Sequence, residues 1–217
     1  MASACSFAAS PTPPDNPGAV REPAVAGLFY PKDPAELSHT IDVLLASAKP
    51  ETVTGQLKAL ICPHAGYRYS GPVAASAYKL LAAHPASTVI LLAPSHYAWF
   101  SQGSVCRENF FRTPLGDAVV ANDLAARLAQ HPPFSLERPE PVQRPDWWRE
   151  ASCAAPETGA DTPHTWEHSA EVQVPFLQKT LPAFRLLPVI MGDVDAAAAA
   201  SALEPFLDEN TLLVVSS

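Results

Sequence analysis

Short apolar runs alternate with amphipathic segments along most of the chain. The runs are rich in Leu, Ile and Val, which predicts buried β-strands, and they lie at residues 57–62, 88–92, 184–192 and 211–217. The segments between them repeat apolar residues every three or four positions, which predicts helices. This alternation predicts an α/β fold, with a mainly parallel sheet and helices on both of its faces.

One predicted helix has a well-defined start. Asp33 stands at the N-cap position, where its side chain can accept a backbone hydrogen bond. Pro34 follows at the first helical position, and Glu36 lies in the first turn. Leu37 and Ile41 then fall on one face of the helix, so we expect them to enter the core.

Proline residues indicate two further features. Pro188 interrupts the run 184–192, and because proline lacks an N–H group we expect this strand near an edge of the sheet. Residues 131–163 are rich in proline and have no periodicity, which predicts a long surface loop. Trp147 and Trp148 lie within this loop, and we expect them to pin it to the body of the protein. The alternative is that they form a lid or contact a partner.

Two of the apolar runs end in the same way. Each is stopped by a proline and followed within two residues by a histidine, His64 in one case and His96 in the other. Because proline cannot continue a central strand, each histidine lies just beyond the carboxyl end of its strand. A helix predicted at 71–83 joins the strands into a βαβ unit, in which the strands are parallel. Both histidines are therefore expected at the same sheet edge, where open α/β sheets bind ligands.

Two imidazoles placed side by side suit a metal ion. Neutral imidazole is a common protein ligand for zinc, copper and iron. The alternative is that each histidine is a hydrogen-bonded turn residue without a ligand. Because the same pattern occurs twice in the chain, we favour a shared metal site at His64 and His96.

A third stretch, 164–177, also carries chemistry-bearing side chains. His168 and Glu171 are three positions apart, so they share a face if this stretch is helical. They can form a proton-transfer pair, or Glu171 can complete the two-histidine site as a carboxylate ligand. The alternative is a capped helix start, in which Glu167 and Glu171 are favoured by the helix dipole. Spacing alone does not separate these interpretations.

Composition narrows the classes of partner and the location. The chain has 14 Lys and Arg against 22 Asp and Glu, a net charge of -8, which argues against a nucleic-acid-binding surface. No apolar stretch approaches the length of a membrane span, so no membrane partner is expected. The N-terminus lacks the basic and apolar regions of a secretion signal, so we expect a cytoplasmic protein.

The same data predict one structured domain after a tail. Residues 1–23 are rich in Ala, Ser and Pro, which is typical of a disordered tail. Apolar residues make up 47% of the chain and charged residues only 17%, a globular composition. We therefore expect a single α/β domain at 24–217.

Six segments of this sequence together resemble the Memo family, whose prokaryotic members are called AmmeMemoRadiSam system protein B. The resemblance runs in order from about Arg21 to the last residue, and six collinear motifs are highly specific. The segments are Ala26-Gly27-Leu28-Phe29-Tyr30-Pro31, Pro63-His64-Ala65-Gly66-Tyr67 with Ser70-Gly71, Pro94-Ser95-His96, Thr113-Pro114-Leu115-Gly116-Asp117, Glu167-His168-Ser169-Ala170-Glu171 and Val214-Val215-Ser216-Ser217.

The resemblance implies a fold similar to the class III extradiol ring-cleavage dioxygenases, which are non-haem iron enzymes. In Memo-like proteins the histidines at the positions of His64 and His96 are ligands of a metal, with iron or copper proposed. The Glu-His-Ser segment borders the same pocket, which favours His168 as a catalytic residue in proton transfer. The expected function is a metal-dependent oxidoreductase that takes a small-molecule or peptide ligand in this pocket.

The sequence also departs from the family pattern. In the family, the strand matching 211–217 continues into an Asp-x-x-His segment, and a cysteine ligand follows much later. This sequence stops at Ser217, so we expect a C-terminally truncated domain whose pocket lacks those ligands. Glu171 or Cys62 can supply a third ligand, although Cys62 is more typical of a buried apolar residue. An exposed sheet edge would then promote oligomerisation.

Two classes of function remain open. The first is the metal-dependent oxidoreductase. The second is a non-catalytic module that keeps the dioxygenase-like fold and binds a protein or peptide in the pocket. A zinc hydrolase is less expected, because no H-E-x-x-H spacing occurs.

Overall fold

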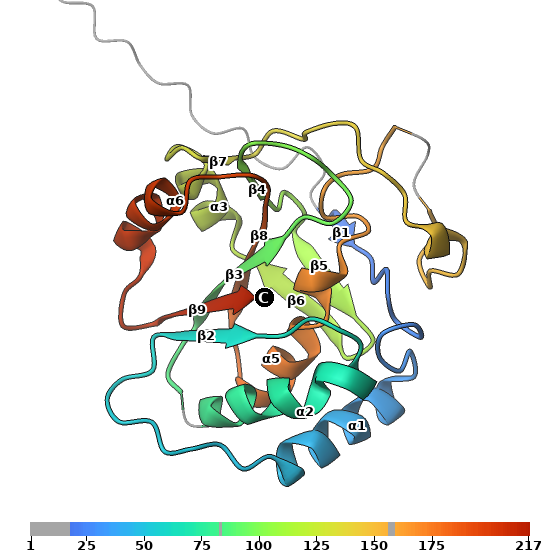
Figure 1. Ribbon diagram of the computed structural model, residues 1–217, viewed down its shortest axis with the longest axis vertical. Helices are drawn as coiled ribbons and strands as arrows, with labels where there is room; N and C mark the ends of the chain where they lie inside the picture. The colour runs from blue at the N-terminus through green and yellow to red at the C-terminus, as the bar shows by residue number, and fades with distance from the viewer. Residues whose placement is uncertain (1–17, 83, 156–158) are drawn as a thin grey trace, which may run out of the picture.

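The computed structural model describes residues 18–82, 84–155 and 159–217. In this part of the chain a single sheet has the strand order β1-β5-β6-β8-β3-β9-β2, with β4 and β7 beside this path (Figure 1). Its strands are β1 Val20–Arg21, β2 Ala59–Cys62, β3 Thr88–Pro94, β4 Gly103–Val105, β5 Phe110–Thr113, β6 Gly116–Val120, β7 Phe134–Ser135, β8 Arg185–Met191 and β9 Thr211–Ser216.

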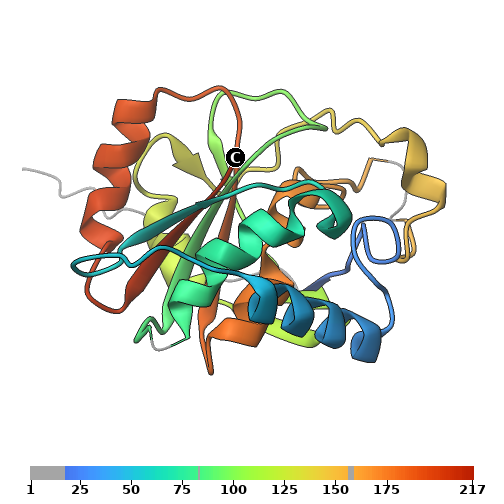
Figure 2. The same ribbon diagram turned by 60° about the horizontal axis from the view of Figure 1, so that its bottom comes forward.

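Helices cover both faces of the sheet, as the sequence predicts. They are α1 Pro34–Ser47, α2 Tyr67–Tyr78, α3 Asn122–Leu128, α4 His168–Glu171, α5 Val174–Thr180 and α6 Ala196–Leu203, with 3-10 turns η1 Lys79–Leu81, η2 Asp146–Arg149 and η3 Glu204–Phe206. The helices α1, α2, α4 and α5 pack on one face, and α3 and α6 pack on the other. Figure 2 shows α1 and α2 on the opposite side of the sheet from α6.

The central strand β3 shows why two layers of helices are needed. Val89 and Leu91 are fully buried in the core beneath α1 and α2, whereas Ile90 is fully buried beneath α3 and α6. Successive side chains of a strand point to opposite faces, so a continuous apolar run requires cover on both sides. The neighbours β8 and β9 are both parallel to β3, which confirms the predicted mainly parallel sheet.

The predicted βαβ unit is present, with one strand inserted. The strands β2 and β3 are both parallel to β9, which lies between them. The connecting helix starts at Tyr67, earlier than the predicted 71–83, and ends in the 3-10 turn at Leu81. Both strands therefore point the same way and bring their carboxyl ends to one edge of the sheet.

The predicted start of the first helix is confirmed in detail. The side chain of Asp33 accepts a hydrogen bond of 2.9 Å from the backbone N–H of Glu36. Pro34 is the first residue of α1. Leu37 and Ile41 are fully buried, so the apolar face of α1 contributes to the core as expected.

The expected position of the strand around Pro188 is wrong. Strand β8 lies inside the sheet, between β6 and β3. On its outer side, β6 pairs with Arg185 and Leu186, and β4 pairs with Val189–Met191. The backbone N–H of Cys106 donates to the carbonyl of Pro188 on this side. The N–H and C=O groups of one strand residue point to the same side of the strand. The position of the missing N–H of Pro188 is therefore on this outer side, between the residues paired with β6 and those paired with β4.

The expected boundary after residue 23 needs a correction. Val20 and Arg21 form β1, which pairs in parallel with β5. Arg21 is only 4% exposed, so this part of the expected tail belongs to the folded domain. Residues 1–17 of the predicted tail lie outside the described residues.

The two tryptophans of the long loop pack against other rings, as expected for a pinned loop. The ring of Trp147 lies 6.0 Å from that of Tyr97 and 6.4 Å from that of Phe29. The ring of Trp148 lies 6.4 Å from that of Trp166, which is fully buried. Aromatic pairs at these separations stabilise the contact between a loop and the core.

Strand β2 lies at one edge of the sheet, and its residue Ile61 is 73% exposed. Exposed edge strands are common sites of association between chains, so oligomerisation through this edge stays a prediction. Of the helices in the described part of the chain, none is long and apolar enough to cross a membrane.

Candidate metal centre

The two predicted histidines lie side by side with His168 beyond the carboxyl ends of β2 and β3. The ring centroids are 5.3 Å apart for His64 and His96, and 4.5 Å apart for His96 and His168. The third pair, His64 and His168, is separated by 5.7 Å. One ring nitrogen of each histidine lies within 4.8 Å of the others. Strand geometry thus predicts the proximity of the first two, and the start of α4 adds the third.

His96 is held by a buried carboxylate that sequence reasoning treated only as a helix-start residue. The Nδ1 of His96 lies 2.9 Å from Oε1 of Glu167, and the backbone N–H of His96 donates to Oε2 at 2.7 Å. A carboxylate only accepts, so Nδ1 carries a proton, and in the neutral ring Nε2 keeps its lone pair. A carboxylate behind a histidine in this way is typical of metal ligands.

Glu167 also caps the helix that carries His168. Its Oε1 accepts a hydrogen bond of 3.1 Å from the backbone N–H of Ser169, so the capped helix start, one of the interpretations that the sequence leaves open, is present. Burial by itself raises the pKa of Glu167, but the hydrogen bonds from His96 outweigh it and hold this pKa below its ordinary value. In turn, the hydrogen bond to Glu167 raises the pKa of His96.

His168 occupies the most enclosed position of the three histidines. Its Nδ1 lies 3.4 Å from the hydroxyl of Tyr97 and 3.4 Å from Oε1 of Glu167, and its ring lies 4.8 Å from that of Phe29. Burial lowers the pKa of His168 to about 4 despite the nearby carboxylate of Glu167. The imidazole is therefore neutral near pH 7, the form that binds metals.

His64 is neutral for a similar reason. Burial lowers its pKa, and the neighbouring His96 lowers it further. Its Nδ1 lies 3.0 Å from the hydroxyl of Ser216, at the end of β9. The hydroxyl thus forms a hydrogen bond with Nδ1 of His64, and Nε2 of the same ring stays available to a ligand.

The donor set fits a metal ion with one open side. Imidazole nitrogens bind zinc at about 2.0–2.1 Å, so nitrogens within 4.8 Å of one another need to approach by on the order of 1 Å to share an ion. Side-chain rotation can supply such a shift. Three protein ligands with an open position are the usual arrangement of catalytic metal sites, and imidazoles accept zinc, copper, iron or nickel.

Glu171 does not belong to this centre, so the hypothesis that it completes the ligand set is wrong. Its carboxylate forms an ion pair with the guanidinium of Arg21 and accepts a hydrogen bond from the hydroxyl of Tyr30. It also accepts backbone N–H groups of Ala24 and Val25 at 2.8 and 3.0 Å. The acceptor positions of Glu171 are thus occupied by the segment that leads into α1.

Cys62 is excluded as a ligand by its surroundings. It is 1% exposed, and burial raises the pKa of its thiol to about 11. Among the described residues, the group whose ligand atoms lie together is His64, His96 and His168, and Cys62 is not part of it. The expectation that Cys62 is a buried apolar residue is confirmed, and it is a free cysteine, like Cys106 and Cys153.

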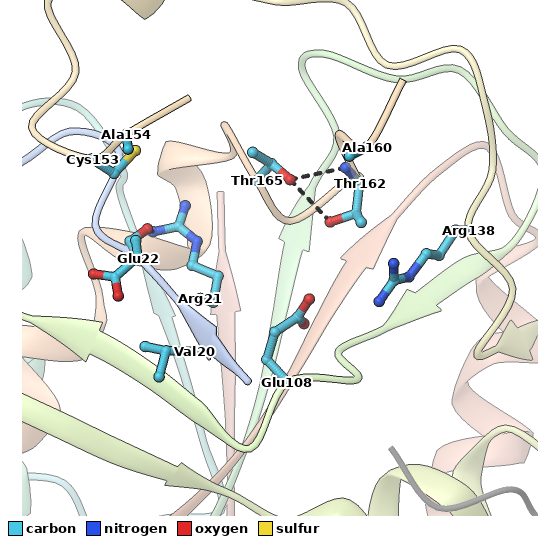
Figure 3. Close-up of a pocket in the computed structure, with 10 residues that line it drawn as sticks. All are labelled: Val20, Arg21, Glu22, Glu108, Arg138, Cys153, Ala154, Ala160, Thr162 and Thr165. Atoms are coloured by element: carbon cyan, nitrogen blue, oxygen red, sulfur yellow. Dashed lines mark hydrogen bonds between the residues drawn. The ribbon is translucent and has the colours of Figure 1, made fainter. Parts of the chain in front are cut away.

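A separate cavity of about 220 Å³ lies near β1 and is not lined by any of the three histidines (Figure 3). Its charged side chains are mixed in sign, with Arg21 and Arg138 opposing Glu22 and Glu108. In Figure 3 the side chain of Arg138 points toward Glu108 across the cavity. Arg21 also pairs with Glu171 and donates to the backbone carbonyl of Glu167 at 2.9 Å, so the lining of this cavity contacts the segment that carries His168.

The fold and the site define a class: an α/β protein with a cluster of three histidines at the carboxyl edge of its sheet. A family model described as Memo-like protein matches residues 21–217. The chain therefore belongs to the Memo-like family, as the six sequence motifs indicate.

Curated relatives support this assignment. A MEMO1 family protein of Methanopyrus kandleri is 35% identical over 212 residues, covering 91% of this chain and 67% of the relative. One of Aquifex aeolicus is 33% identical over 203 residues, covering 91% and 66%. One of Methanocaldococcus jannaschii is 34% identical over 186 residues, covering 79% and 57%. The chain thus spans about two thirds or less of the length of these relatives.

Proposed function

We propose that this chain binds iron(II) or copper through His64, His96 and His168 and acts as a metal-dependent oxidoreductase. One observation carries the proposal: a ring nitrogen of each histidine lies within 4.8 Å of the others. A bound iron or copper ion supplies redox chemistry that the side chains themselves lack. The resemblance of Memo-like proteins to non-haem iron dioxygenases supports the same class of reaction.

The protein's own contribution is to hold the three imidazoles in place and to keep two of them neutral. Glu167 fixes the ring of His96 through Nδ1, and the lowered pKa values of His64 and His168 keep both rings unprotonated near pH 7. Protons therefore compete little with a metal at these two positions. His96 is partly exposed, with 37% of its side chain accessible, so a substrate can reach the open side of the centre.

Metal titration tests this proposal. The metal-free chain is titrated anaerobically with Fe(II) and with Cu(I) in a calorimeter, beside the double variant His64→Ala/His96→Ala. We expect one ion per chain in the parent and none in the variant. The double variant His39→Ala/His131→Ala removes two exposed histidines and should bind like the parent. Equal binding by all three proteins would contradict the proposal.

The same titration separates two roles for His168. If His168 is a ligand, His168→Ala lowers metal affinity as strongly as loss of His96. If it transfers protons, as the family resemblance implies, His168→Ala keeps the metal but slows oxygen uptake driven by ascorbate as electron donor. We favour the ligand role, because the ring nitrogens lie within one cluster.

A second candidate is a non-catalytic module that binds a protein or peptide. Trp99 favours it, because this residue is 91% exposed three positions after His96. Exposed tryptophans are enriched in protein interfaces. This function predicts ligand binding that survives a chelator and survives His96→Ala, whereas the oxidoreductase loses its activity in both cases.

A further inference from the structure

The hydroxyl of Ser216 is the centre of a small buried network beside His64. It donates to the carbonyl of Ser169 at 2.7 Å, and it lies 3.0 Å from Nδ1 of His64. It also accepts a hydrogen bond of 2.9 Å from Nε2 of Gln173. Ser216 is 4% exposed and Gln173 is 1% exposed, so water does not replace these contacts.

The orientation of Gln173 is set by its other neighbours. Its Nε2 donates to the carbonyl of Pro63 at 3.0 Å, and its Oε1 accepts from the hydroxyl of Tyr78 at 2.7 Å. A carbonyl can only accept, so the amide nitrogen has to face Pro63 and Ser216. Gln173 therefore always presents a donor to the Ser216 hydroxyl.

The direction of the remaining hydrogen bond follows from counting protons. A hydroxyl has one proton, and Ser216 gives it to the carbonyl of Ser169, which cannot donate. Toward His64 the hydroxyl can then only accept, so Nδ1 of His64 must carry the proton. The Nε2 of His64 is left with a free lone pair.

We propose that Ser216, oriented by Gln173, is a positioning residue that commits His64 to the Nδ1–H tautomer and so presents its Nε2 to the metal. This inference rests on the proposed function of the histidine cluster. Glu167 imposes the same tautomer on His96 with a charged acceptor, so the two strand-end histidines offer equivalent nitrogens. The role also explains why a serine stands at the end of β9, beside the carboxyl end of β2.

The first test reads the tautomer directly, without metal. Long-range proton–nitrogen NMR correlations of the metal-free chain, labelled with ¹⁵N at histidine, distinguish Nδ1–H from Nε2–H at about pH 7.5, and His64→Gln assigns the signals. We expect Nδ1–H at His64 in the parent and a shift toward Nε2–H in Ser216→Ala. Ser216→Thr keeps the hydroxyl and should restore the parent tautomer.

The second test measures metal affinity in the same proteins. Loss of a residue that orients a metal ligand typically weakens binding by about 10–100-fold, and we expect this for Fe(II) with Ser216→Ala. Thr180→Ala is the matched control, because the partly buried Thr180 also donates its hydroxyl to a backbone carbonyl, that of Phe176 on α5, which does not contact the three histidines. It should leave both the tautomer and the affinity unchanged.

The outcomes separate this inference from the proposed function. An unchanged His64 tautomer in Ser216→Ala, or an Nε2–H tautomer in the parent, overturns the positioning role even if the metal binds. A parent chain that binds no metal overturns the proposed function, while the NMR result still decides the role of Ser216 in fixing the tautomer.

Discussion

Glu167 is 1% exposed, yet its pKa lies below the ordinary value because His96 donates to it from both Nδ1 and the backbone. An ionised carboxylate in a buried position needs such compensation. The same hydrogen bond raises the pKa of His96 and fixes its ring. One residue thus sets both the charge and the orientation of a proposed metal ligand.

The substitution Glu167→Gln should lower the pKa of His96 in the metal-free protein, because the negative charge that stabilises the imidazolium is lost. It should also weaken Fe(II) binding by about 10–100-fold. An NMR titration of the His96 ring measures the first effect. Glu108→Gln is the control, since Glu108 lines the separate cavity. An unchanged His96 pKa in Glu167→Gln would contradict this role.

Single residues differ in how far the sequence could place them. His64 and His96 follow prolines at strand ends, a local pattern that is visible in the sequence. The contact between Glu167 and His96 joins residues 71 positions apart, and that between Arg21 and Glu171 joins residues 150 positions apart. Such pairs depend on how elements pack, so the sequence could not show that Glu171 is occupied.

At the scale of elements, the one-turn helix α4 connects the site to the N-terminal segment. His168 at its start faces the other histidines, while Glu171 at its end pairs with Arg21 of β1. The pair is almost completely buried, with 3% and 0% of the two side chains exposed. Removal of one partner leaves an uncompensated buried charge.

We expect Arg21→Met to lower the free energy of unfolding by about 3–5 kcal/mol. The double variant Arg21→Met/Glu171→Gln should lose less than the sum of the two single variants, because no unpaired charge remains. Urea unfolding measures both. The exposed pair of Arg112 and Asp117 is the control, and Arg112→Met should change stability little. Additive losses at Arg21 and Glu171 would contradict the coupling.

Long elements could be predicted better than short ones. The apolar runs of β3, β8 and β9 and the cap of α1 follow local rules, so the sequence indicates them. The strands β1 and β7 have two residues each and carry no period, so they depend on their neighbours in the sheet. The interior position of β8 was mispredicted, because the gap between β6 and β4 that accepts Pro188 is a property of the sheet.

At the scale of the whole molecule, buried histidines link stability to pH. Burial lowers the pKa of His168 to about 4 and also lowers those of His64 and His164. The unfolded chain binds protons at these residues near their ordinary pKa of about 6.5, whereas the folded chain does not. Acid therefore favours unfolding of the metal-free protein below about pH 6.5. His96 acts in the opposite direction, because folding raises its pKa.

The variant His168→Gln should lose less stability than the parent between about pH 7.5 and about pH 5. The loss in the parent should exceed that in the variant by about 2 kcal/mol. This is the free energy that follows when the pKa of His168 is about 4 in the folded state and about 6.5 in the unfolded state. Urea unfolding of both metal-free proteins at the two pH values gives this number. His39→Gln changes an exposed histidine and should behave like the parent. A parallel loss in His168→Gln and parent would show that His168 titrates normally.

The central claim is that the three histidines hold a redox metal. Its most direct test is elemental analysis of the chain purified without oxygen, beside His64→Ala/His96→Ala matched for folding by circular dichroism. The account predicts close to one iron or copper per chain in the parent and none in the double variant. The absence of iron and copper from the parent, or equal metal content in the two proteins, would contradict it.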